Sequence, residues 1–187
     1  MGGQVDAKAG IIHFHTGPGP RLLKIVHTLL DDFDISAPHL YATHISRSPE
    51  LLDDAIRLAK RGAFVDIDTV EPGVGKWFRY YLEHDGPPDQ LTASSDAHVI
   101  DSKLNLYREF QASIRDEHLP LVTVLPFFTR NTANVLRLPT KGQLREGMDA
   151  DLLVLNRDTF DIVHVFAKGR QVVKDGQVIA EEQFKNN

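Results

Sequence analysis

Two histidines and an aspartate stand at the ends of predicted strands in this chain. His15 and His44 each close a short apolar run, and Asp96 follows the run 91–94. In a parallel α/β sheet or barrel, functional side chains gather at the carboxyl ends of the strands. Two imidazoles and one carboxylate form a ligand set for catalytic zinc with an open position for water. The spacing therefore predicts a shared zinc site with a carboxylate as proton shuttle.

The elements that must position these residues alternate between strands and helices. Ser48 is a predicted N-cap, Pro49 suits the first position of the helix that follows, and Gly62 lies where that helix should stop. Strands that alternate with helices predict βα units and a parallel sheet. The predicted strands are 11–15, 40–44, 63–68 and 91–94, and the predicted helices are 22–33, 49–61 and 74–83.

The pattern changes after Asp101. Helical spacing continues over 105–114, 119–129 and 131–137, and Pro126 should end or kink the second of these helices. Beyond Gly142 the chain has β character over 150–155, 162–167 and 171–173, with turns at Lys168-Gly169 and Asp175-Gly176. We therefore predict two domains, 10–137 and 138–187.

Composition excludes several classes of protein. The 187 residues contain 26 acidic and 21 basic side chains, a net charge of -5 that argues against nucleic-acid binding. No apolar run approaches the ~20 residues of a membrane span, and the first ten residues lack the apolar core of a signal peptide. We predict a cytoplasmic protein with no membrane partner. The absence of cysteine leaves histidine and carboxylate as the metal ligands.

Several short motifs resemble the C-terminal half of the amidohydrolase superfamily, specifically of isoaspartyl (β-aspartyl) dipeptidases. The resemblance implies the C-terminal half of a (β/α)8 barrel, four βα units with strands five to eight, followed by part of a small β-sandwich. The segments that carry it are Phe14-His15-Thr16-Gly17, Ala42-Thr43-His44-Ile45-Ser46-Arg47, Val65-Asp66-Ile67-Asp68-Thr69 and Ser94-Ser95-Asp96, with 131–136, 141–142, 147–155, 168–170 and 173–176 downstream.

The resemblance also implies roles for four residues. His15 and His44 resemble the ligands of one metal in a binuclear zinc pair. Asp96 resembles the aspartate that binds the other metal and carries a proton to the leaving amine. Arg47 resembles the arginine that grips the α-carboxylate of the dipeptide substrate.

The chain departs from the family pattern in two places. The family's His-x-His pair and its metal-bridging carboxylated lysine would lie upstream of Met1, and Ala97-His98-Val99-Ile100 replaces small residues and a substrate-contacting serine. We therefore expect a truncated form that binds at most one zinc ion and is inactive alone. Its partner would be the missing N-terminal half or a second copy.

His13 lies two positions before His15, so on a strand the two side chains share a face. The pair could be interpreted as the family's opening His-x-His. A barrel that began there would need ~250 residues, however, which is more than this chain has. We predict that His13 lies deeper in the barrel interior.

The primary hypothesis is a zinc-dependent amidohydrolase that cleaves a C–N amide bond in a small carboxylate-bearing substrate. One alternative is a cyclic-amide hydrolase of the dihydroorotase or hydantoinase type. The other is a non-catalytic fragment that only associates with a partner chain. Arg47 favours an anionic substrate but does not separate the two enzymes.

Overall fold

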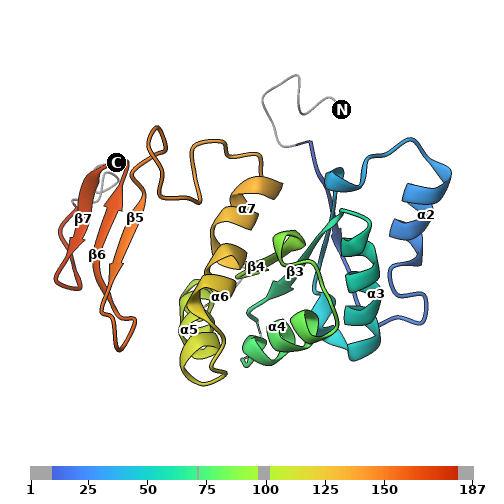
Figure 1. Ribbon diagram of the computed structural model, residues 1–187, viewed down its shortest axis with the longest axis horizontal. Coiled ribbons are helices and arrows are strands. Elements are labelled where there is room, and N and C mark those ends of the chain that lie inside the picture. Colours follow the sequence, from blue (N-terminus) through green and yellow to red (C-terminus); the bar gives the residue numbers. More distant parts are fainter. Residues whose placement is uncertain (1–9, 71, 97–101, 181–187) are drawn as a thin grey trace, which may run out of the picture. The chain divides into compact units, whose positions relative to one another are not determined.

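The computed structural model describes residues 10–70, 72–96 and 102–180 (Figure 1). The chain divides into two compact units between Gly142 and Gln143. The first unit alternates strands with helices, and the second is an antiparallel sheet. Within the described residues, no helix combines the length and the apolar character that a membrane crossing requires.

The first unit is built on a four-stranded parallel sheet whose strands follow the order of the chain, β1-β2-β3-β4. Such an order is that of successive βα units in a barrel, so the unit forms half of a (β/α)8 barrel. Its strands are β1 (Ile12–His15), β2 (Leu40–Thr43), β3 (Phe64–Asp68) and β4 (Leu91–Ser94). Its helices, which flank the sheet in Figure 1, are α2 (Lys24–Asp32), α3 (Pro49–Lys60), α4 (Val74–Glu83), α5 (Ser102–Arg115), α6 (Leu121–Phe128) and α7 (Arg130–Val135).

Side-chain alternation gives this sheet one apolar and one polar face. Thr43 pairs with Asp66 and Asp66 with Thr92, so polar residues of neighbouring strands stand side by side. On β2, β3 and β4 the apolar face consists of buried residues: Leu40, Ala42, Val65, Ile67, Leu91 and Ala93. The polar face carries His13, His15, Tyr41, Thr43, Asp66, Asp68, Thr92 and Ser94.

Helix α3 forms as its capping residues predict. Ser48 Oγ accepts a 3.2 Å hydrogen bond from the Leu51 amide, and Pro49 occupies the first helical position. Leu51 and Leu52 are fully buried, and burial of such a side chain contributes about 1.5–3 kcal/mol. Gly62 follows the helix with a φ of +96°, a conformation that glycine adopts without steric cost.

Helix α6 differs from its predicted span of 119–129. Leu119 precedes Pro120, and the residue before a proline is disfavoured in helical conformation, so the helix begins at Leu121. Pro126 lies inside the helix, which continues to Phe128. The following helix α7 ends at Val135, with Leu136 as its C-cap, and so stops before residue 137, the end of its predicted span.

The second unit is an antiparallel sheet in the order β5-β6-β7-β8. The tight turns predicted at Lys168-Gly169 and Asp175-Gly176 are present, and all four residues have positive φ as such hairpin turns require. The two-residue β8 was not predicted. The strands are β5 (Leu152–Leu155), β6 (Ile162–Ala167), β7 (Arg170–Lys174) and β8 (Gln177–Val178).

Candidate active site

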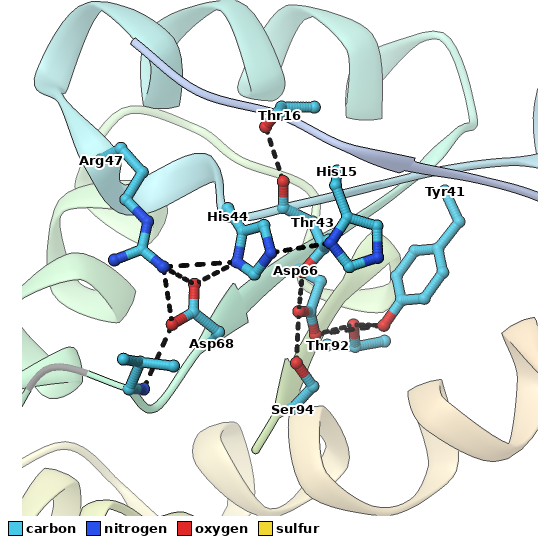
Figure 2. Close-up of polar contacts among 11 residues, drawn as sticks. His15, Thr16, Tyr41, Thr43, His44, Arg47, Asp66, Asp68, Thr92 and Ser94 are labelled. Carbon is cyan, nitrogen blue, oxygen red and sulfur yellow. Dashed lines mark hydrogen bonds and ion pairs between the residues drawn. The ribbon is translucent and has the colours of Figure 1, made fainter. Parts of the chain in front are cut away.

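His15 and His44 face each other at the carboxyl ends of β1 and β2 (Figure 2). His15 Nδ1 lies 3.0 Å from His44 Nε2. His44 has a φ of +66°, a left-handed conformation in which histidine is enriched among non-glycine residues, and it leads into the short 3-10 helix η2 (Ile45–Arg47). Thr16 Oγ1 donates to the Thr43 carbonyl at 2.6 Å and ties the two strand ends together. The structure thus brings two of the three predicted metal ligands into contact.

Asp68, the last residue of β3, lies behind His44. Its carboxylate is 1% exposed, and Oδ2 lies 2.8 Å from His44 Nδ1. The Val70 amide donates to Oδ1 at 3.1 Å. The predicted substrate-binding residue Arg47 donates to both oxygens, at 3.3 and 3.2 Å. Asp68 therefore connects a predicted metal ligand with the predicted substrate arginine.

Asp66 forms the floor beneath the histidine pair (Figure 2). It is fully buried and accepts hydrogen bonds from the hydroxyls of Tyr41, Thr43, Thr92 and Ser94 at 3.1, 2.6, 2.8 and 2.6 Å. Burial raises the pKa of Asp66, and the four hydroxyl donors oppose that rise by stabilising the carboxylate. Burial, followed by the negative charge of Asp66, raises the pKa of Tyr41, so its hydroxyl stays protonated.

Asp96, the third predicted ligand, follows β4 in a left-handed conformation with a φ of +45° and is half-buried. Among the residues that the structure describes, no group of three or more His, Cys, Asp or Glu side chains is arranged to hold a metal. The roles of Asp96 therefore remain predictions. Ala97-His98-Val99-Ile100 lies outside the described residues.

His13 shares the polar face with His15, as its position on the strand predicts. The two ring centroids are 4.9 Å apart, and His13 stacks on Tyr41 at 4.7 Å with an interplanar angle of 15°. His13 is exposed rather than buried in an interior, because β1 is the edge strand of this sheet.

Asp66 and Asp68 had no predicted role, although the sequence carries a signal for them. Val65-Asp66-Ile67-Asp68 alternates apolar and acidic residues, and a strand with this alternation places both carboxylates on one face. Because both aspartates lie on a strand that is buried throughout, they required partners, which the hydroxyls and His44 supply.

A protein-family model described as an amidohydrolase family matches residues 80–180, which is more than half of the chain. The chain belongs to this family of amidohydrolases. Within it, the predicted resemblance to the isoaspartyl dipeptidases is confirmed by solved structures. A β-aspartyl dipeptidase of Fervidobacterium islandicum AW-1, solved with a β-Asp-Leu dipeptide, is 30% identical with a TM-score of 0.87.

That match covers 97% of this chain and 52% of the dipeptidase, so the chain spans about half the length of this relative.

An adenine deaminase of Geobacillus kaustophilus (strain HTA426) is 28% identical over 164 residues, which are 83% of this chain and 28% of that protein. The atrazine chlorohydrolase of Arthrobacter aurescens TC1, solved with zinc, is 15% identical with a TM-score of 0.56, over 95% of this chain and 47% of its own. This last likeness shows the fold alone.

Proposed function

We propose that this chain supplies half of the active site of a zinc-dependent amidohydrolase of the isoaspartyl dipeptidase type. The enzyme would hydrolyse a C–N amide bond in a small substrate that carries a carboxylate. The observation that carries the proposal is the 3.0 Å approach of His15 Nδ1 to His44 Nε2 at the carboxyl ends of neighbouring strands. Membership of the amidohydrolase family supports the reaction class.

The chemistry of the histidine pair suits one zinc ion. Two nitrogen ligands of one tetrahedral zinc ion, each with a bond of ~2.1 Å, would lie about 3.4 Å apart. The two histidine nitrogens are 3.0 Å apart, close to this value. His15 and His44 would therefore hold the metal, with further ligands from outside the described residues or from Asp96. When bound, zinc lowers the pKa of water to ~7 and polarises the carbonyl of the amide.

Asp96 is proposed as the proton shuttle. In amide hydrolysis the oxygen of water bonds to the carbonyl carbon and the C–N bond breaks. The water gives up a proton, and the leaving nitrogen requires one. A carboxylate at the end of β4 can accept the first proton and deliver it to the amine.

Arg47 is proposed to bind the carboxylate of the substrate. Its side chain is 28% exposed, and Asp68 holds its guanidinium beside His44. A guanidinium pairs with a carboxylate through two parallel N–H donors, which fixes both the position and the orientation of an anionic substrate. The amide bond would then be held near the histidine pair.

The sheet edge and helix α2 support the proposal that another polypeptide completes the site. Ile12 on the edge strand β1 is 41% exposed, and Ile25 and Phe33 are 68% and 59% exposed. An uncovered edge strand offers its backbone groups to another strand. The partner would be an upstream barrel half or a second copy of this chain.

Complementation tests this function directly. The chain would be co-expressed with the N-terminal half of the Fervidobacterium islandicum dipeptidase and the purified complex assayed for hydrolysis of β-Asp-Leu. We expect zinc-dependent turnover by the complex, none by the isolated chain, and loss in His44→Ala. His84→Ala is the matched control, because His84 stacks on Tyr80 at the end of α4.

Three outcomes would overturn parts of this proposal. A stable complex without turnover would support a non-catalytic fragment. Turnover of a cyclic amide such as a hydantoin, with no action on the dipeptide, would favour the cyclic-amide hydrolases. Chelator-sensitive turnover by the isolated chain would show that its own residues complete the site, and would return His13 and His15 to consideration as an opening metal pair.

A further inference from the structure

We propose that Asp68 is a positioning residue that sets the tautomer of His44, so that Nε2 carries a lone pair on the side facing His15. A metal ligand must present such a lone pair. The proposal rests on the proposed function only where it concerns metal binding, because the tautomer is a property of the chain itself.

The buried carboxylate of Asp68 lies directly against the His44 ring. Asp68 Oδ2 lies 2.8 Å from His44 Nδ1, and the Asp68 side chain is 1% exposed. An ionised carboxylate only accepts hydrogen bonds, so His44 must donate through Nδ1–H. A neutral imidazole has one N–H group, and Nε2 is then left without a proton.

The carboxylate is itself held in place. The Val70 amide donates to Oδ1, and a backbone N–H cannot reverse its role. This contact occupies Oδ1, and Oδ2 is the oxygen that lies against His44 Nδ1. Arg47 donates to both oxygens and supplies a compensating positive charge for the buried anion.

Arg47 offers a competing arrangement. Its guanidinium nitrogen lies 3.4 Å from His44 Nδ1, and a hydrogen bond there would require a bare Nδ1 and the opposite tautomer. The contact with Asp68 is shorter at 2.8 Å, whereas 3.4 Å exceeds the usual range for N–H donors. The guanidinium is also closer to the carboxylate oxygens. Asp68 therefore decides the tautomer.

The consequence extends to His15. His44 Nε2 without a proton accepts from His15 Nδ1, 3.0 Å away, while no metal is bound. The three side chains form a directed series in which His15 donates to His44 and His44 donates to Asp68. Carboxylates placed behind metal-binding histidines act in this way to fix ring orientation and raise ligand basicity.

Asp68→Asn tests the direction of this series with nearly unchanged shape. The Val70 amide requires the oxygen of the introduced side-chain amide on its own side, where Arg47 can also donate to it. The NH₂ group then lies against His44 Nδ1. His44 should then switch to the Nε2–H tautomer, and His15 should accept at Nδ1. An aspartate-to-asparagine change behind a histidine is known to enforce the wrong tautomer in this manner.

The measurement is a long-range ¹⁵N–¹H NMR correlation on the ¹⁵N-histidine-labelled full chain at about pH 8, where ordinary imidazoles are neutral. We expect Nδ1–H at both His44 and His15 in the wild type, and Nε2–H at both in Asp68→Asn. Asp54→Asn is the matched control, since Asp54 is a buried aspartate beside His27 Nε2 at 3.0 Å. It should leave His15 and His44 unchanged. Arg47→Met should also leave the His44 tautomer unchanged.

The wild-type spectrum alone can overturn the proposal, so the test survives a variant that fails to fold. Nε2–H at His44 in the wild type, or a tautomer that Arg47→Met rather than Asp68→Asn switches, would contradict it. Zinc titration separates this proposal from the proposed function: Asp68→Asn should bind zinc about 10–100-fold more weakly. The predicted tautomers without zinc binding in either protein would uphold the positioning role and refute the metal site.

Discussion

Thr43 Oγ1 donates a 2.6 Å hydrogen bond to Asp66 Oδ2, so the residue before His44 is tied to a carboxylate buried at the centre of the neighbouring strand. Thr92 and Ser94 on β4 donate to the same carboxylate. One buried carboxyl group thus joins three strands below the candidate site. This arrangement helps to hold the ends of β2 and β3, and with them His44 and Asp68, in position.

Asp66→Asn should change the pH dependence of stability. The pKa of Asp66 is raised in the folded state, so its stabilising contribution is complete below the ordinary carboxyl pKa and is lost as pH rises through the folded value. Because asparagine does not ionise, the variant does not undergo this pH-dependent loss of stability. It should be destabilised at low pH by about 1–3 kcal/mol for mismatched hydrogen bonds, and the deficit should shrink as pH rises.

Urea unfolding of both proteins across this pH range measures the effect. Asp32→Asn, at an exposed aspartate of α2, is the control and should follow the wild type at every pH. A deficit that is constant with pH, or that grows as pH rises, would contradict the assigned direction of the shift.

Arg47→Met should weaken binding of a carboxylate-bearing substrate in the complemented enzyme. A hydrogen bond to a charged group contributes about 1.5–3 kcal/mol, which corresponds to a rise of roughly 10–100-fold in KM. Arg57→Met removes an arginine that pairs with Asp54 on α3 and should leave KM unchanged. Steady-state kinetics with β-Asp-Leu checks this, and an unchanged KM in Arg47→Met would remove Arg47 from the substrate site.

Asn131→Asp should destabilise the first unit more than Asn131→Ala. The fully buried Asn131 Nδ2 donates to the Pro88 and Leu91 carbonyls, both at 2.7 Å, and so anchors α7 to the start of β4. Alanine removes both hydrogen bonds, each of which contributes about 0.5–1.5 kcal/mol, while the Pro88 carbonyl keeps the Leu91 amide as a donor. Aspartate adds repulsion between oxygens. Thermal and urea unfolding would measure both changes, and an Asn131→Asp variant as stable as the wild type would refute the anchoring role.

Much of the first unit could be predicted from residue patterns. The alternation of strands and helices predicted α4 and β4 with their observed bounds, Val74–Glu83 and Leu91–Ser94, although the helical pattern of α4 is the weaker one. The two-residue β8 carries no such signal, since a strand of that length depends on its pairing with β7. To predict the start of α6 at Leu121, one must include the restriction that Pro120 places on the backbone of Leu119.

The candidate site could be predicted in part. Their positions at strand ends were sufficient to predict that His15 and His44 lie together, and their ring nitrogens are 3.0 Å apart. The role of Asp68 depends on which oxygen faces which nitrogen, and spacing along a chain does not specify this. The same limit applies to Arg47, whose contact with Asp68 arises from the turn at η2 rather than from any sequence period.

The account depends most on the metal position at the histidine pair, and anomalous diffraction from zinc-soaked crystals of the chain measures it directly. We predict one zinc peak per chain, bonded at ~2.1 Å to His15 Nδ1 and to His44 Nε2, and absent in His44→Ala. A peak bonded to His13, two peaks per chain, or no peak between His15 and His44 at saturating zinc would contradict the account.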